Sequence, residues 1–136
     1  MIDKDDFIEW FQVHSNMYGT SKSQIAAIRD AGKIPLLDID IQGTEKFVKA
    51  YPETNTLFVF PPSVDALKTR LEKRGTETAE TLATRLGNAT KEMQRGLMKE
   101  DPSLLIGYRM VNDDLAKSVP MFVRLFEALY GDELKK

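Results

Sequence analysis

Short apolar runs bounded by turn residues divide the chain. One run lies at residues 34–39, and a second lies at residues 56–60 and ends at Pro61-Pro62. Continuous apolar runs of this length are typical of strands that are covered on both faces, as in parallel sheets. The sequence therefore predicts two buried strands here, and residues 106–111 supply a third.

Between these runs, apolar residues recur every three or four positions, which is the helical period. Ser63 is placed to cap one helix, whereas Pro120 should kink the last helix or move its start to near Ser118. We predict helices over 21–31, 42–50 and 64–73, a long amphipathic helix after a polar turn at 74–78, and a final helix over 114–130. The predicted buried stripe of the final helix is Leu115, Val119, Phe122, Phe126 and Leu129. Strands that alternate with helices predict an α/β fold with a parallel sheet.

Aromatic and β-branched residues dominate residues 7–20, which favours one or two strands with a turn at Ser15-Asn16. Glu9 and Tyr18 are the polar side chains of this region that are available to a ligand. His14 is interpreted as a surface histidine or one with its hydrogen bonds satisfied, because no serine or cysteine nucleophile lies in a recognisable motif nearby.

Composition excludes several classes of function. The 136 residues predict one domain, and a net charge of −2 provides no general positive field for nucleic acid or an anionic membrane. The absence of cysteine excludes disulfides and thiolate metal sites, and a single histidine excludes a histidine-cluster metal centre. No apolar run is long enough to span a membrane and no signal peptide is evident, so we expect a cytoplasmic protein.

Asp38 and Asp40 lie at the end of the first apolar run. Open α/β sheets bind ligands beyond the carboxyl ends of their strands, so these carboxylates lie where a metal, a phosphate or a basic partner is expected. Alternatively, one aspartate caps the following helix and the other pairs with a surface arginine. The sequence leaves both interpretations open.

The segment 74–100 is polar at its start and carries Arg74 and Arg85. It is either a solvated helical hairpin, whose surface ion pairs are each worth less than about 1 kcal/mol, or a mobile lid. A lid would bring planar guanidinium groups to phosphate oxygens.

Six segments, taken together, resemble the guanylate kinase family in their order and approximate spacing. They are residues 7–10, 13–20, 36–43, 61–63, 70–78 and 111–115, with the sequences FIEW, VHSNMYGT, LLDIDIQG, PPS, RLEKRGTET and VNDDL. The resemblance implies a three-layer α/β fold with a parallel sheet of the P-loop kinase type. In such a fold, 7–20 is part of the GMP-binding β region, 21–73 and 101–136 form the core, and 74–100 is the lid.

The resemblance also implies an activity, the transfer of the γ-phosphoryl group of ATP to GMP with Mg²⁺. Glu9 matches the glutamate that accepts hydrogen bonds from guanine, while Tyr18 and Thr20 match residues that bind the GMP phosphate. A carboxylate suits guanine because it accepts from N1–H and the amino group together, which adenine does not offer.

The remaining matches concern ATP and the metal. The resemblance implies that Asp38 and Asp40 serve the metal-water shell and the nucleotide, with Asp38 acting on the metal through water and Asp40 on GMP. The lid arginines that gather around the ATP phosphates match Arg70, Arg74 and Arg85, and Asn112 matches a residue near the adenine. Fixed cations that stabilise spread negative charge are most of what phosphoryl transfer requires.

One departure separates the chain from that family. None of the eight glycines belongs to a G-x-x-x-x-G-K-[ST] motif, so we expect an N-terminally truncated form that is inactive alone. The family's loop strand lies between residues 34–39 and 56–60, and its loss predicts unfilled strand edges that favour a homo-oligomer or strand exchange. Two alternatives stay open: a non-catalytic domain that binds a phosphorylated or acidic peptide, and an α/β domain of unrelated function.

Overall fold

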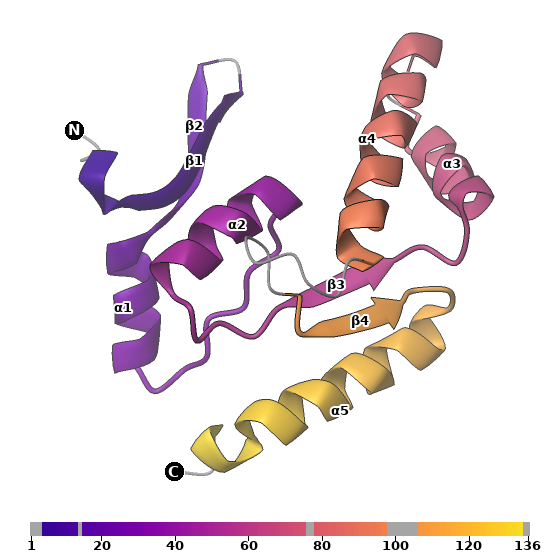
Figure 1. Cartoon of the computed structure of the whole chain (residues 1–136). Helices are drawn as coiled ribbons and strands as arrows, with labels where there is room; N and C mark the ends of the chain where they lie inside the picture. The colour runs from indigo at the N-terminus through magenta and orange to yellow at the C-terminus, as the bar shows by residue number, and fades with distance from the viewer. Residues whose placement is uncertain (1–3, 14, 76–77, 98–105, 135–136) are drawn as a thin grey trace. The chain divides into compact units, whose positions relative to one another are not determined.

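The computed structural model describes residues 4–13, 15–75, 78–97 and 106–134 (Figure 1). His14, part of the predicted lid turn and residues 98–105 lie outside the described residues. The α/β class is confirmed. The elements, in chain order, are the 3₁₀ helix η1 (Lys4–Asp6), β1 (Phe7–Val13), β2 (Asn16–Ser21), α1 (Lys22–Asp30), α2 (Ile41–Ala50), β3 (Leu57–Phe60), α3 (Val64–Lys73), α4 (Ala79–Leu97), β4 (Tyr108–Val111) and α5 (Leu115–Leu134).

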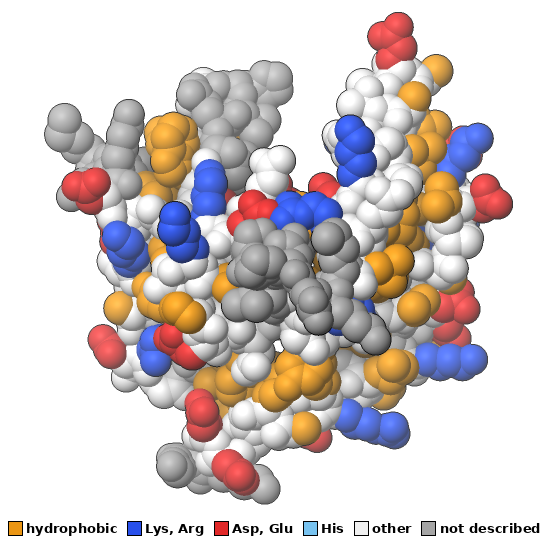
Figure 2. All heavy atoms as spheres, viewed as in Figure 1, with side chains coloured by type: hydrophobic (Ala, Val, Ile, Leu, Met, Phe, Trp, Pro, Cys, Tyr) orange, Lys and Arg blue, Asp and Glu red, His pale blue; other side chains and the backbone are white. Residues whose placement is uncertain are grey.

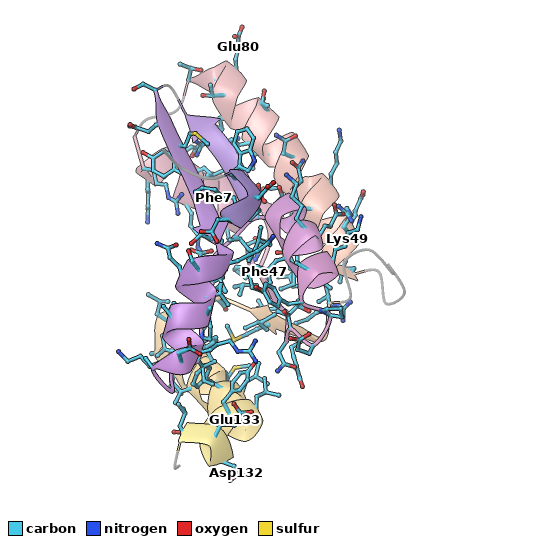
Figure 3. The ribbon with its side chains drawn as sticks, turned by 90° about the vertical axis from the view of Figure 1, so that its left-hand side faces the viewer. Phe7, Phe47, Lys49, Glu80, Asp132 and Glu133 are labelled. Atoms are coloured by element: carbon cyan, nitrogen blue, oxygen red, sulfur yellow. The ribbon has the colours of Figure 1, made fainter. Side chains whose placement is uncertain are left out.

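The chain divides into two compact units, residues 1–54 with 125–136, and residues 55–124. In the first unit, β1 and β2 form an antiparallel hairpin, which confirms two strands in this region. Asn16, predicted to lie in the turn, instead pairs with Val13 as the first residue of β2. Helix α2 packs against β1, and α1 contacts β2. Phe47 lies on the inner side of α2 and is buried, whereas Lys49 points outward on the same helix (Figure 3).

Residues 33–40 contain no regular secondary structure, so the strand predicted at 34–39 is wrong. An extended segment becomes a strand only when its backbone N–H and C=O groups pair with a neighbour, and no described residue supplies that ladder. Leu36, predicted to be buried, is accordingly 69% exposed. Apolar composition therefore indicates a segment suited to a strand, but none of the described residues pairs with it.

In the second unit, β3 and β4 pair in parallel, with Phe58 opposite Arg109 (Figure 1). The strands predicted at 56–60 and 106–111 are thus confirmed. Helix α3 begins at the predicted cap, because the Ser63 hydroxyl accepts a hydrogen bond from the Ala66 N–H at 3.0 Å. It packs against the long helix α4, whose first turn carries the outward-pointing Glu80 (Figure 3).

Helix α5 begins at Leu115, close to the predicted start at 114, and Pro120 lies inside it, so the alternative start near Ser118 is wrong. Asp114 makes the earlier start favourable, because its carboxylate accepts from the Ala116 N–H and its carbonyl from the Lys117 and Ser118 N–H groups.

The buried stripe of α5 also differs from the prediction at its first two positions. Leu115 and Val119 are 67% and 53% exposed, whereas Ser118 is 4% exposed. Figure 2 shows that hydrophobic side chains lie at the surface among charged ones. At about 100° per residue, Ser118 is in phase with the half-buried Phe122. Val119 lies at the margin of that stripe, and Leu115, although in phase, is the first helical residue, where less protein covers it. None of the described helices is both long and apolar enough to cross a membrane.

Candidate functional site

The β1–β2 hairpin places three of the predicted site residues on one face. Glu9 lies opposite Thr20, and Tyr18 is two positions from Thr20 along β2. Because directly opposed residues and residues two apart share a face of a sheet, the Glu9, Tyr18 and Thr20 side chains project from the same side of the hairpin. Tyr18 is 50% exposed there.

Glu9 is a buried carboxylate with a specific donor. Its side chain is 7% exposed, and the Thr20 hydroxyl donates a hydrogen bond to Glu9 Oε1 at 2.7 Å. Burial of a charged group is costly unless it is hydrogen-bonded, and this bond supplies part of what water would have supplied. The pair therefore fixes where the carboxylate points.

The N-terminus of α2 brings a second carboxylate to the same place. Asp40 caps the helix by accepting a hydrogen bond from the Gly43 N–H at 2.7 Å. A Cβ atom on Gly43 would lie 3.2 Å from Asp40 Oδ1 and 3.5 Å from Glu9 Oε2. Both carboxylates thus approach the bare Cα of Gly43, at the positive end of the helix dipole, which favours negative charge.

Of the two aspartates whose role the sequence left open, Asp40 therefore does cap the next helix. Asp38 is exposed. Among the described residues, no three Asp, Glu, His or Cys side chains gather as a metal-binding group. Magnesium usually keeps several waters and takes one or two carboxylates in addition to substrate phosphates, so a single exposed carboxylate fits it only through water.

The junction of β2 and α1 holds a further carboxylate, Asp6. It accepts hydrogen bonds from the Ser23 hydroxyl and from the Ser23 N–H, the latter at 3.0 Å. These bonds hold the pKa of Asp6 below its ordinary value, and the bond from the Ser23 hydroxyl contributes most to this shift. Ser21 is buried and caps α1 by accepting from the Gln24 N–H at 3.1 Å. The chain is thereby fixed immediately after Thr20.

The predicted lid arginines lie on α3 and α4 in the second unit. Arg70 lies in the last turns of α3, and Arg74, four positions later, is the C-cap residue that follows the helix and precedes Gly75, where φ is +70°. The Arg70 Nη2 group donates to the Asp113 carbonyl at 3.2 Å. Arg85 is exposed on α4. Arg74 and Arg85 thus lie within the predicted lid segment 74–100, whereas Arg70 precedes it on α3.

Asn112 follows β4 directly, and its N–H donates to the Phe60 carbonyl at 2.7 Å, which continues the β3–β4 ladder. Its side-chain Oδ1 is buried and has no hydrogen-bond partner among the residues that the structure describes. Buried acceptors are usually paired, so this oxygen is available for a ligand donor. The carboxyl end of this two-stranded sheet thus presents Asn112 beside the carbonyl that Arg70 contacts.

Three residues of these regions were missed from sequence. In the sequence, Gly43 is only the end of a motif, and Gly96 is only one of eight glycines. Arg109 lies within an otherwise apolar predicted strand, and a charged residue in such a strand indicates a specific partner. Its Nε donates to the Gly96 carbonyl.

Comparisons with known proteins agree on one family. The family model described as guanylate kinase matches residues 1–129. The guanylate kinase of Bdellovibrio bacteriovorus is 40% identical over 123 residues, which is 90% of this chain and 63% of that protein. That of Helicobacter pylori strain 26695 is 40% identical over 128 residues, 94% of this chain and 59% of that protein. The chain therefore spans about three fifths of the length of these relatives.

A solved structure shows the same fold. The crystal structure of guanylate kinase from Anaplasma phagocytophilum matches with a TM-score of 0.64 at 26% identity, over 90% of this chain and 55% of that one. The P-loop kinase type expected from the sequence is thus confirmed, and the described residues form a mixed α/β structure of two small sheets and five α-helices.

Proposed function

Because this chain belongs to the guanylate kinase family, we propose that its 136 residues carry the GMP-recognising region and the arginine-bearing lid of an enzyme that phosphorylates GMP with ATP. The observation that carries the proposal is the buried Glu9 carboxylate, held by Thr20 and adjoining the Asp40 cap. Two carboxylates that converge on one point match the adjacent N–H donors of guanine.

Glu9 and Asp40 accept from the guanine edge, while Thr20 orients Glu9. Tyr18, exposed on the same hairpin face, binds the GMP phosphate. AMP has neither the N1–H nor the 2-amino group of guanine, so each carboxylate would lose a charge-assisted bond worth about 1.5–3 kcal/mol. We expect GMP to bind at least about tenfold more tightly than AMP.

Arg70, Arg74 and Arg85 stabilise the negative charge of the ATP phosphates, and the buried Asn112 oxygen accepts a hydrogen bond from the adenine amino group. Mg²⁺ accompanies ATP and would neutralise charge on its phosphates, with Asp38 acting only through water. The chain's own contribution is therefore binding and electrostatic stabilisation.

Phosphoryl transfer also needs a loop whose backbone N–H groups and lysine hold the ATP phosphates. The 136 residues contain no such motif. We therefore expect little turnover of ATP and GMP by this polypeptide alone, and turnover once a relative's phosphate loop, with its strand and helix, is joined before residue 1. Absence of turnover in that folded chimera would contradict the proposal.

The assignment of Glu9 has its own test. Glu9→Ala should abolish the preference for GMP over AMP in calorimetric titrations, whereas Glu53→Ala, which removes an exposed carboxylate of the same unit, should leave it unchanged. Equal loss in both variants would show that net charge, not Glu9, controls binding.

The absent phosphate loop favours a second candidate, a non-catalytic domain that uses the same region for a phosphorylated or acidic peptide. Such a domain would bind a phosphopeptide in competition with GMP, and the loop chimera would stay inactive. Competition together with a turnover-competent chimera would favour the kinase.

Self-association is part of the proposal. Among the described residues, no strand pairs with the edge of β3 that faces away from β4, and Val59 on that strand is 47% exposed. An unpaired apolar edge promotes pairing between copies. Light scattering should show a dimer or larger species, which Val59→Lys reduces to monomer. A monomeric parent would contradict this part.

A further inference from the structure

Two residues paired across strands in the second unit contact the C-terminal end of α4, the helix of the predicted lid. Phe58 on β3 and Arg109 on β4 lie directly opposite each other, so both side chains project from the same face of the two-stranded sheet. Both reach Gly96, in the last turn of α4.

The Phe58 ring determines that residue 96 is glycine. A Cβ atom there would lie 2.8 Å from ring Cδ2 and 2.9 Å from both Cε2 and Cγ, which no side chain tolerates without a shift. The ring has little room to give, because its centroid is 4.5 Å from that of Phe60. Gly96 is also the buried residue of α4, so the helix rests on the ring at this point.

Arg109 holds the same residue from its carbonyl side. Its Nε donates to the Gly96 carbonyl, in the last described turn of α4. A guanidinium at a helix C-terminus is also favoured by the helix dipole. The ring thus fixes how closely α4 approaches the sheet, and the guanidinium fixes its direction.

Because α4 extends far beyond this contact, a small tilt at Gly96 becomes a large displacement at the other end of the helix. Arg85 precedes Gly96 by eleven residues, about 16 Å along a helix at 1.5 Å per residue. A tilt of about 10° at Gly96 would move Arg85 by about 3 Å, which is the length of a hydrogen bond. Small changes at the joint therefore determine whether Arg85 reaches its target.

We propose that Phe58, Gly96 and Arg109 form a joint that positions the lid helix, so that Arg109 and Gly96 are positioning residues for the arginine delivered to the ATP phosphates. This inference rests on the proposed function for the role of Arg85, but the joint itself is a statement about the position of α4. The two can be tested separately.

The distance experiment uses the chain's lack of cysteine. Spin labels are attached at Ala83→Cys, an exposed position of α4, and at Lys117→Cys, an exposed position of α5. Both positions belong to the second unit, so the distance between the labels reports the position of α4 within that unit. Arg109→Met and Gly96→Ala should shift or broaden the distance distribution by about 3 Å. Lys91→Met, which removes an exposed cation from α4 itself, should leave it unchanged.

Arg109→Lys retains a donor on a long stem and should give a narrower distribution than Arg109→Met. Circular dichroism confirms that each variant is folded, and if Gly96→Ala fails to fold, Arg109→Met alone decides. An Arg109→Met distribution that matches the parent would overturn the joint.

The effect of the joint on catalysis is measured in the chimera that carries a phosphate loop. Arg109→Met should raise KM for ATP severalfold while GMP affinity, measured by calorimetry, stays at the parental value. If the parent chimera shows no turnover, the proposed function is contradicted, but the distance measurement still tests whether the joint positions α4. An unchanged KM for ATP, with a shifted lid, would overturn the positioning role.

Discussion

Thr20→Val tests the central contact of the candidate site. Valine has nearly the shape of threonine but lacks the hydroxyl that donates to Glu9 at 2.7 Å. The substitution therefore leaves a carboxylate that is 7% exposed without its donor, and nothing else in the hairpin need change.

The expected cost follows from burial and charge. An unsatisfied buried acceptor costs about 1–3 kcal/mol, and more when it is charged, so we expect a loss of about 2 kcal/mol in the free energy of unfolding. Thr20→Ser keeps the hydroxyl and deletes one methyl, which is worth less than about 1 kcal/mol at a half-buried position. In a Glu9→Gln background the bond is neutral, so Thr20→Val should cost about half as much.

Urea unfolding followed by fluorescence measures these differences, because Trp10, the chain's one tryptophan, is adjacent to Glu9. Equal stabilities for the valine and serine variants would refute the conclusion that the hydroxyl supports the carboxylate. An unchanged cost in the Glu9→Gln background would show that the effect of valine does not act through Glu9.

Three further outcomes are expected. Gly19→Ala should cost more than about 2 kcal/mol, because its Cβ would lie 2.5 Å from the Glu9 carbonyl oxygen, whereas Gly87→Ala, with no atom within 4 Å, should stabilise α4 by up to about 1 kcal/mol; urea titrations compare them, and equal effects would contradict the geometry. Asp40→Asn should keep the α2 cap yet weaken GMP binding about tenfold or more, whereas Asp40→Ala should also cost about 1 kcal/mol of stability; unfolding and calorimetry separate the two effects, and full GMP affinity in the asparagine variant would exclude Asp40 from guanine. Because the pKa of Asp6 is lowered in the fold, its contribution to stability is present above the ordinary carboxyl pKa and is lost as pH falls through the lowered value, so parent and Asp6→Asn should converge in acid; a stability difference that persists at the lowest pH would contradict this.

Local signals in the sequence predicted the elements well. Ser63 caps α3 through an atom three residues away, and the hairpin needs only its own alternation and turn, so a short window contains the whole cause. The class and the family followed from such windows, read in order. The described parts of the predicted lid also have the expected helical form.

What failed depended on partners distant in sequence. Residues 34–39 have the composition of a strand, yet a strand exists only with a neighbour, and no described residue pairs with them. Gly96 and Arg109 acquire meaning only once β3 and β4 are side by side, which places Phe58 and Arg109 on one face. The role of Thr20 at the GMP phosphate stays a prediction, whereas its bond to Glu9 can be seen only from the hairpin register.

Calorimetric titration of the 136-residue chain with GMP and with AMP tests the account most directly, since it requires neither the phosphate loop nor catalysis. We predict that GMP binds at least about tenfold more tightly, as two buried or capped carboxylates facing guanine donors require. Equal affinities for GMP and AMP in the folded chain would contradict the assignment of Glu9 and Asp40 and, with it, the proposed guanine site.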